Sequence, residues 1–219
     1  LLLVLMIAIS IPVQLNSNKK DLYRSLLIIY SFSFLADIFI GGVALLAFPD
    51  KFLRIKIQEI TNASFALIEF CIFVFYFHRL LFNRIATSVI IISYIIFLVF
   101  YLTFVNHTII DSPITFLSSL TDKIVSYEMV VLALLSLSFY YKLLKDPINN
   151  SLLESPSFWI VTGLFFYCIV SAPFFTIGIQ LLMSNVTLYS SLFAIHYLFA
   201  TILFISITKA FLCRRSLIL

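Results

Sequence analysis

A series of seven long apolar segments, the first of them incomplete, constrains the fold of this chain more than any other feature. A hydrocarbon core about 30 Å thick is crossed by an α-helix of about 20 apolar residues. Hydrophobic residues make up 63% of the chain, whereas soluble domains usually contain about 45–50%. We therefore expect an all-α, polytopic membrane bundle. The predicted spans lie at 1–15, 25–48, 60–82, 86–105, 125–143, 158–183 and 188–212.

The connectors between these segments are short, which predicts one transmembrane helical domain over residues 1–219 with the lipid bilayer around it. The sequence opens inside an apolar run and has no initiator Met. The segment "LNSNKKDLYR" follows that run without a small-residue cleavage site. We therefore interpret the run as part of a first span and not as a cleaved signal peptide.

The distribution of basic residues predicts the orientation. Of the 14 Lys and Arg residues, ten fall on one side of the predicted membrane and four on the other. Cytoplasmic loops carry the excess of Lys and Arg. This rule places the N-terminus outside and the C-terminus in the cytoplasm, with residues 106–124 as the longest outer loop. The net charge of +4 then comes from basic residues at the ends of the spans, where they set the membrane topology, and not from a nucleic-acid binding patch. We therefore expect no nucleic-acid partner.

Several classes of site are disfavoured. The three cysteines, Cys71, Cys168 and Cys213, are far apart and lack C-x-x-C spacing, which argues against a disulfide framework or a zinc site. No lysine lies deep in the last span and no two histidines share a depth, which argues against a retinal Schiff base and paired haem ligation. The H-E-x-x-H and G-x-S-x-G signatures are missing. We expect no enzyme activity, cofactor or metal.

Ionisable side chains inside the predicted spans are the candidates for function. Asp37 and Glu69 lie at similar depths in the second and third spans, and His196 lies near the middle of the seventh. Glu128 is expected nearer the outer mouth of the fifth span. A carboxylate at a helix centre costs about 2.5–3.5 kcal/mol on insertion scales, so such groups usually face the bundle interior.

Polar residues recur on the same helical faces as these groups, because residues three, four or seven apart share a face. The stripe on the third span holds Asn62, Glu69 and Tyr76. The stripe on the second span holds Tyr30, Ser33, Asp37 and Gly41. Matching stripes predict a shared interior pocket for a ligand or a proton. Its candidate residues are Tyr30, Asp37, Asn62, Glu69, Tyr76, Glu128 and His196.

The chain resembles a family of short bacterial inner-membrane proteins of about seven spans and no assigned activity. The resemblance depends on Glu69 in an I-E-F context, on Glu128 at the start of the fifth span, and on an S-P-x-F-W-x-x-x-G motif. That motif comprises Ser155, Pro156, Phe158, Trp159 and Gly163. Members of the family are often encoded beside sensor histidine kinases. The resemblance therefore implies a sensory or signalling accessory in the bacterial inner membrane and offers no catalytic residues.

Three functions are compatible with these patterns. The first is a noncatalytic sensory or signalling accessory, in which the polar pocket binds a small molecule or a proton and a separate membrane protein, such as a histidine kinase, receives the signal. The second is a structural subunit of a larger membrane complex, in which the polar groups form interhelical hydrogen bonds worth about 0.6–2 kcal/mol each. The third, a proton or ion pathway, is less favoured because the inner halves of the helices are mostly Phe, Leu and Ile.

Overall fold

The structure, a computed structural model, describes residues 50–81, 84–109, 114–145 and 152–213, together with residues 30, 35, 39, 42 and 43. All regular structure in this part of the chain is helical. The helices are α3 (Lys51–Leu81), α4 (Arg84–Ile109), α5 (Ile114–Lys145), the short 3-10 helix η1 (Leu152–Glu154), α6 (Pro156–Ser184) and α7 (Val186–Leu212).

Five of these helices are long and apolar enough to cross a membrane. They correspond to the last five of the predicted spans, which confirms that this part of the chain is all-helical and that these helices have the length and apolar character of membrane spans. The predicted span 1–15 and most of the predicted span 25–48, including Asp37, lie outside the described residues.

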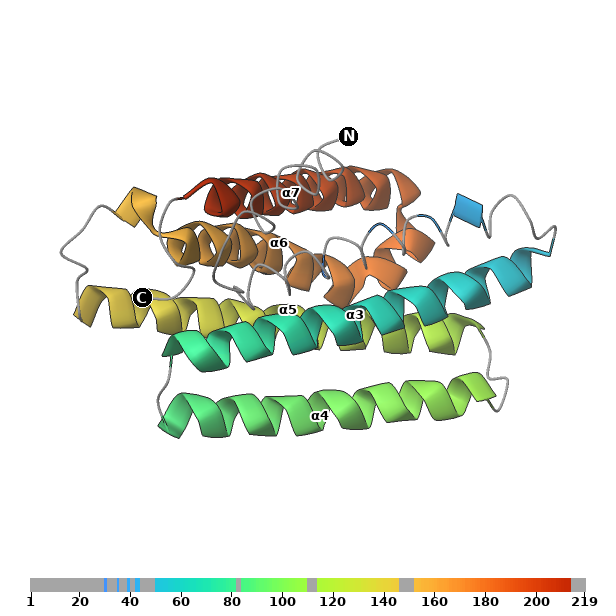
Figure 1. Cartoon of the computed structure of the whole chain (residues 1–219). Coiled ribbons are helices and arrows are strands. Elements are labelled where there is room, and N and C mark those ends of the chain that lie inside the picture. The colour runs from blue at the N-terminus through green and yellow to red at the C-terminus, as the bar shows by residue number, and fades with distance from the viewer. Residues whose placement is uncertain are drawn as a thin grey trace.

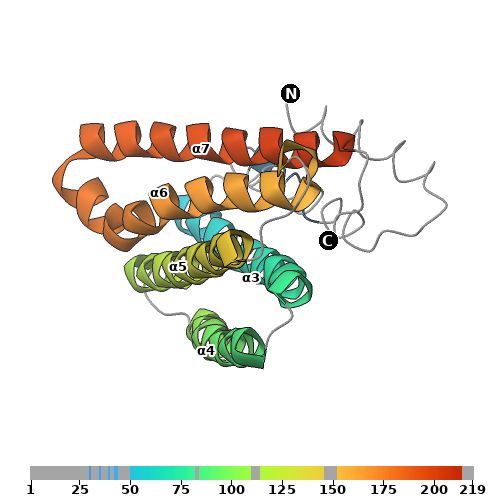
Figure 2. The same ribbon diagram turned by 90° about the vertical axis from the view of Figure 1, so that its left-hand side faces the viewer.

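The five helices form a layered bundle (Figure 1). The α6–α7 pair packs side by side, α5 packs against α6 and α3, and α4 packs against α3 and α5. In Figure 2, where α3, α4 and α5 are seen nearly end-on, α6 and α7 still extend across the view. The α6–α7 pair therefore crosses the other three helices obliquely.

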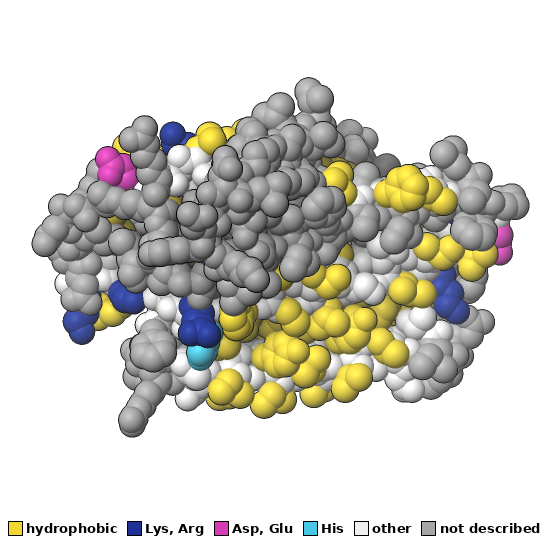
Figure 3. Space-filling model, viewed as in Figure 1, with side chains coloured by type: hydrophobic (Ala, Val, Ile, Leu, Met, Phe, Trp, Pro, Cys, Tyr) yellow, Lys and Arg dark blue, Asp and Glu magenta, His cyan; other side chains and the backbone are white. Residues whose placement is uncertain are grey.

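Charged side chains lie at both ends of the bundle. One end, which we call the basic end, carries Arg79, Lys142, Lys145 and Lys209. The other end, which we call the α6–α7 end, is where α6 turns into α7 at Asn185. Figure 3 shows hydrophobic side chains over the middle of the visible face and charged side chains near both ends. This pattern is the one expected of a bundle that crosses a bilayer.

Two helices begin earlier than the sequence pattern predicts. Helix α3 starts at Lys51 and not at residue 60, and α5 starts at Ile114 and not at residue 125. Charged residues such as Lys and Glu end a hydropathy window but are good helix formers. Each start closely follows a proline in the sequence, Pro49 or Pro113. The 32 residues of α5 span about 48 Å, so α5 extends beyond a hydrocarbon core, and most of the predicted outer loop at 106–124 is helical.

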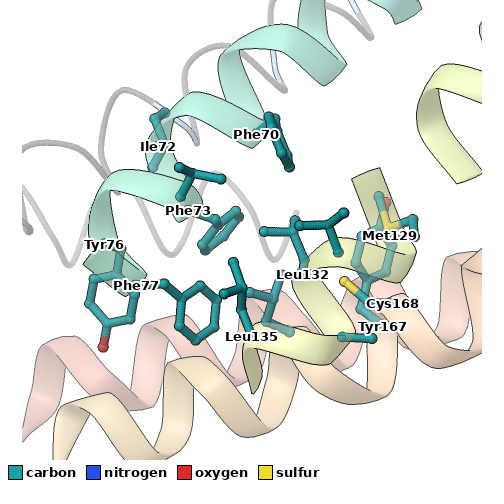
Figure 4. Packing of buried hydrophobic residues seen from close by; sticks show 14 of the residues in the cluster. Phe70, Ile72, Phe73, Tyr76, Phe77, Met129, Leu132, Leu135, Tyr167 and Cys168 are labelled. Carbon is teal, nitrogen blue, oxygen red and sulfur yellow. The ribbon is translucent and has the colours of Figure 1, made fainter. Parts of the chain in front are cut away.

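The apolar core lies between α3 and α5 on the basic side of Glu69. Phe73 and Phe77 of α3 are fully buried and lie toward Leu132 and Leu135 of α5 (Figure 4). Between helices in a bilayer, such side chains contribute through close van der Waals packing. The core closes this half of the bundle with tightly packed apolar side chains.

Helix α6 holds most of the motif on which the family resemblance depends, and the structure gives parts of it a packing role. Pro156 occupies the first turn of α6, where a missing N–H breaks no hydrogen bond. Gly163 faces α7 so closely that an added Cβ would lie 2.6 Å from Ser206 Cβ. Trp159 Nε1 donates a hydrogen bond to the Leu153 carbonyl at 2.8 Å. These contacts dock α6 on α7 and on η1.

Pro173 lies inside α6, and Figure 2 shows α6 changing direction in its second half, before the turn into α7. A proline in a helix interior removes one backbone hydrogen bond and favours a kink. The bend moves the last turns of α6 toward α5, where they help to form the site described next.

Candidate functional site

A cavity of about 540 Å³ lies within the bundle, toward the α6–α7 end. Residues from α3, α5, α6 and α7 line it, together with Gly42. Ligand pockets in proteins usually measure about 300–1,000 Å³, so this cavity is large enough for an organic molecule. Met129 and Tyr167 line it at the edge of the apolar core (Figure 4).

Two helical faces supply the polar wall of the cavity. On α3, Glu59, Asn62, Ala66 and Glu69 all line it. On α5, Ser118, Thr121, Val125 and Glu128 line it with the same spacing of three, four and three residues. This spacing keeps each set on one helical face. Ser118 Oγ donates a hydrogen bond to Glu59 Oε1 at 2.7 Å and so joins the two faces.

Glu69 lies at the inner end of the α3 face and is almost fully buried. The Tyr30 hydroxyl donates a hydrogen bond to Glu69 Oε1 at 3.1 Å. The Tyr30 ring packs against Phe73, with ring centroids 5.2 Å apart. The structure thus brings together one predicted residue of the second span and one of the third.

Glu128 differs from Glu69 in that neither of its carboxyl oxygens has a hydrogen-bond partner among the described residues. Its side chain is 0% exposed and lines the cavity. The sequence places Glu128 near the outer mouth of its span, but α5 starts eleven residues earlier than predicted, so Glu128 lies about 21 Å along the helix from Ile114. Glu128 is therefore a buried, unpartnered acid near the middle of its helix.

His196 stands on the opposite wall of the cavity, on α7. Its Nδ1 lies 2.8 Å from Ser171 Oγ on α6. Aromatic rings surround the imidazole, with Phe175 at 5.2 Å and Phe174 at 5.7 Å between ring centroids. Ser171 orients the imidazole, and the rings give this side of the cavity an aromatic surface.

Two acids at the site escape the sequence prediction. Glu59 and Asp122 fall outside the predicted spans, but both lie on the extended first turns of α3 and α5 and line the cavity. An added Cβ at Gly178 would lie 3.6 Å from Asp122 Oδ2, so the bent part of α6 passes close to this carboxyl group. The sequence signal for both acids is their spacing, because Glu59 lies three residues before Asn62 on α3 and Asp122 lies four residues after Ser118 on α5.

Tyr76 does not line the cavity, although the sequence places it on the polar stripe of Asn62 and Glu69. It is buried in the apolar core, with its ring centroid 5.9 Å from that of Phe77. The 14 residues from Asn62 to Tyr76 advance the helix by about 21 Å. Residues on the same face of α3 can therefore lie at different depths in the bundle, and the polar stripe extends beyond the cavity to Tyr76. Asp37, the remaining candidate, lies outside the described residues.

The cavity has an acidic and aromatic character. Four carboxylic side chains line it, those of Glu59, Glu69, Asp122 and Glu128, and the described lining contains no Lys or Arg. Among the described residues no group of three or more His, Cys, Asp or Glu side chains is placed to hold a metal ion. The arrangement can hold an organic ligand between acids on one wall and rings on the other.

Comparisons with protein-family models, with curated proteins and with solved structures find no match for this chain.

Proposed function

We propose that this chain is a noncatalytic sensory or signalling accessory that binds a small molecule in its intramembrane cavity. The observation that carries this proposal is the 540 Å³ cavity lined by Glu69, Glu128 and His196, in which the buried Glu128 carboxyl has no hydrogen-bond partner among the described residues. Native proteins rarely leave buried polar side chains unpartnered. A bound ligand supplies the missing partner.

The packing around the cavity favours ligand binding over the two other functions. A proton or ion pathway needs polar groups or water through the full depth of the bundle, but on the basic side of Glu69 the described core holds buried apolar residues such as Phe73, Phe77 and Leu132. A purely structural subunit would use its polar groups between helices or toward another chain. Here the acids of α3 and α5 line a cavity instead.

The proposal includes the full topology. The chain has seven spans in the bacterial inner membrane, with its N-terminus outside and its C-terminus in the cytoplasm, so that the basic end faces the cytoplasm. The resemblance to short seven-span proteins encoded beside histidine kinases supports this arrangement and suggests a kinase as the receiving partner. The connectors at the basic end are too short to hold an output domain.

Helix α6 is the element best placed to transmit binding. Its bent half contributes Phe174, Phe175 and Gly178 to the cavity wall, and its other end contacts η1 through Trp159. A ligand shifts a conformational equilibrium only by its difference in affinity for two states. The proposal therefore requires that α6 be bent differently in the free and bound states.

The test is purification from native membranes in mild detergent, followed by mass spectrometry of retained small molecules and proteins. We expect the wild-type protein to retain a small molecule and a membrane-bound kinase. Glu128→Gln should lose the small molecule, because the amide keeps the shape but replaces one carboxyl oxygen with an NH2 group that cannot accept a hydrogen bond. Glu154→Gln makes the same change in η1, outside the cavity, and should retain the small molecule.

Two outcomes contradict the proposal. If wild type and Glu128→Gln both purify, folded, with a large complex and no small molecule, the chain is a structural subunit. If the protein folds and purifies with neither, the signalling role fails.

A further inference from the structure

We propose that the cavity selects organic cations, meaning molecules with a positively charged amine, or an equivalent onium centre, on an apolar body. This inference rests on the proposed function, because it takes the cavity to be a ligand site, and it adds the charge class of the ligand. Three independent features support it: the balance of charge in the lining, the state of Glu128 and the aromatic wall.

The ionisable groups that line the cavity include four acids and no Lys or Arg among the described residues. The acids form two layers, with Glu59 and Asp122 in the layer toward the α6–α7 end and Glu69 and Glu128 deeper. Each layer therefore places one acid of α3 and one acid of α5 in the wall of the same cavity. No Lys or Arg from the described residues enters the lining. Burial and a neighbouring acid disfavour the charged form of a carboxyl group, and a cation held between the acids favours it.

Glu128 points to a ligand independently of the number of acids. It is fully buried, lines the cavity and has neither oxygen hydrogen-bonded among the described residues. A buried carboxyl group without a partner is destabilising. A structural acid of the kind that holds helices together is expected to have such a partner, as Glu69 has in Tyr30.

The aromatic wall suits the apolar body of a cation. Tyr189, Phe193 and Tyr197 of α7 line the cavity, with the Phe193 ring 4.7 Å from Tyr197 and 5.9 Å from Tyr189 between centroids. Phe174 of α6 lies 5.8 Å from Phe193. Aromatic faces attract cations through their quadrupoles, by about 2 kcal/mol or more when the pair is desolvated. Acids on one wall and rings on the other therefore favour the same ligand class.

The size of the cavity and the spacing of its acids favour an organic cation over a metal ion. The cavity measures about 540 Å³, and a divalent metal takes six or more oxygen ligands at about 2.0–2.6 Å. No cluster of three or more potential metal ligands exists among the described residues. The acids instead lie at two depths, since Asp122 and Glu128 are separated by about 9 Å along α5.

The test compares two ions of nearly the same shape and opposite charge, tetraphenylphosphonium and tetraphenylborate. Binding of each radiolabelled ion to the full chain in lipid nanodiscs is measured by equilibrium dialysis, with empty nanodiscs as the blank. We expect saturable binding of the cation and no saturable binding of the anion. Glu128→Gln and Asp122→Asn should each weaken cation binding about tenfold, because each removes a group that can carry a negative charge beside the bound cation.

The controls keep the outcome decisive. Glu154→Gln removes one charge outside the cavity and should leave the affinity for tetraphenylphosphonium unchanged. Asp122 is only half-buried, so Asp122→Asn remains a valid test if Glu128→Gln fails to fold. The slimmer cation benzyltrimethylammonium repeats the measurement for a smaller body.

Equal affinity for the two tetraphenyl ions, or a cation affinity that neither acid substitution alters, overturns the selection of cations. Failure of both cations to bind overturns it as well. None of these results removes the proposed ligand-binding function, because that function is tested separately by the small molecule that purifies with the protein.

Discussion

Tyr30 and Glu69, 39 residues apart in the sequence, meet inside the bundle through a hydrogen bond of 3.1 Å from the phenol to the carboxyl group. Both side chains are 1% exposed. The bond connects a residue of the N-terminal region to the polar face of α3, at the inner end of the cavity. Glu69 and Glu128 are therefore equally buried but differ in hydrogen bonding, because Glu69 accepts a bond from Tyr30 and Glu128 has no such partner among the described residues.

Tyr30→Phe should lower the stability of the protein by about 1 kcal/mol, because it removes the hydrogen bond to Glu69 and keeps the ring in its packing. Thermal unfolding in detergent, followed by circular dichroism, measures the change. Tyr141→Phe removes the same atom from an exposed side chain and should have no effect. Equal unfolding temperatures for the two variants would show that the Tyr30 hydroxyl contributes nothing to stability.

Gly163→Ala should lower the stability by about 1–3 kcal/mol through overpacking, because the new Cβ would lie 2.6 Å from Ser206 Cβ and 3.2 Å from Leu203 Cα. Gly178→Ala is the matched control, since its Cβ would meet Asp122 at an ordinary 3.6 Å. The measurement is the urea or heat stability of both variants in one detergent. Equal stability of both variants and wild type would mean that α6 and α7 do not pack this closely.

The apolar pattern predicts the existence of the helices, but it does not predict where α3 and α5 begin. A hydropathy window ends where charges appear, whereas a helix ends where its backbone hydrogen bonding or its propensity fails. Lys56 and Asp122 end the window without ending the helix. For the same reason the sequence pattern places Glu128 near the outer mouth of the fifth span and does not identify Glu59 and Asp122 as residues of the site.

The polar stripes predict part of the site for a clear physical reason. Seven-residue spacing fixes the face of a helix but not the length over which that face borders a cavity. Asn62 and Glu69 therefore line the cavity as expected, while Tyr76 on the same stripe lies in the core. The partner of His196, Ser171, is beyond reach of single-helix patterns because it comes from the packing of α6 on α7.

Ser171→Ala should weaken the orientation of His196 and lower stability by about 1 kcal/mol, since the Ser171 hydroxyl is buried and bonded to Nδ1 at 2.8 Å. NMR of ¹⁵N-labelled histidine in detergent should show a change in the tautomer populations of His196. Ser138→Ala on α5 removes an exposed hydroxyl that bonds only to its own helix and should leave that spectrum unchanged. An unchanged His196 spectrum in Ser171→Ala would contradict the orienting role.

Single cysteines at opposite ends of the bundle test the proposed orientation. In a variant with Cys71, Cys168 and Cys213 replaced by alanine, Ser184→Cys lies at the α6–α7 end and Lys145→Cys at the basic end, both at exposed positions. With the N-terminus outside, a membrane-impermeant maleimide added to spheroplasts should label Ser184→Cys at once. It should label Lys145→Cys only after permeabilisation, because the positive-inside rule puts the basic end in the cytoplasm. The reverse pattern would place the mouth of the acidic cavity on the cytoplasmic side and rule out an external ligand.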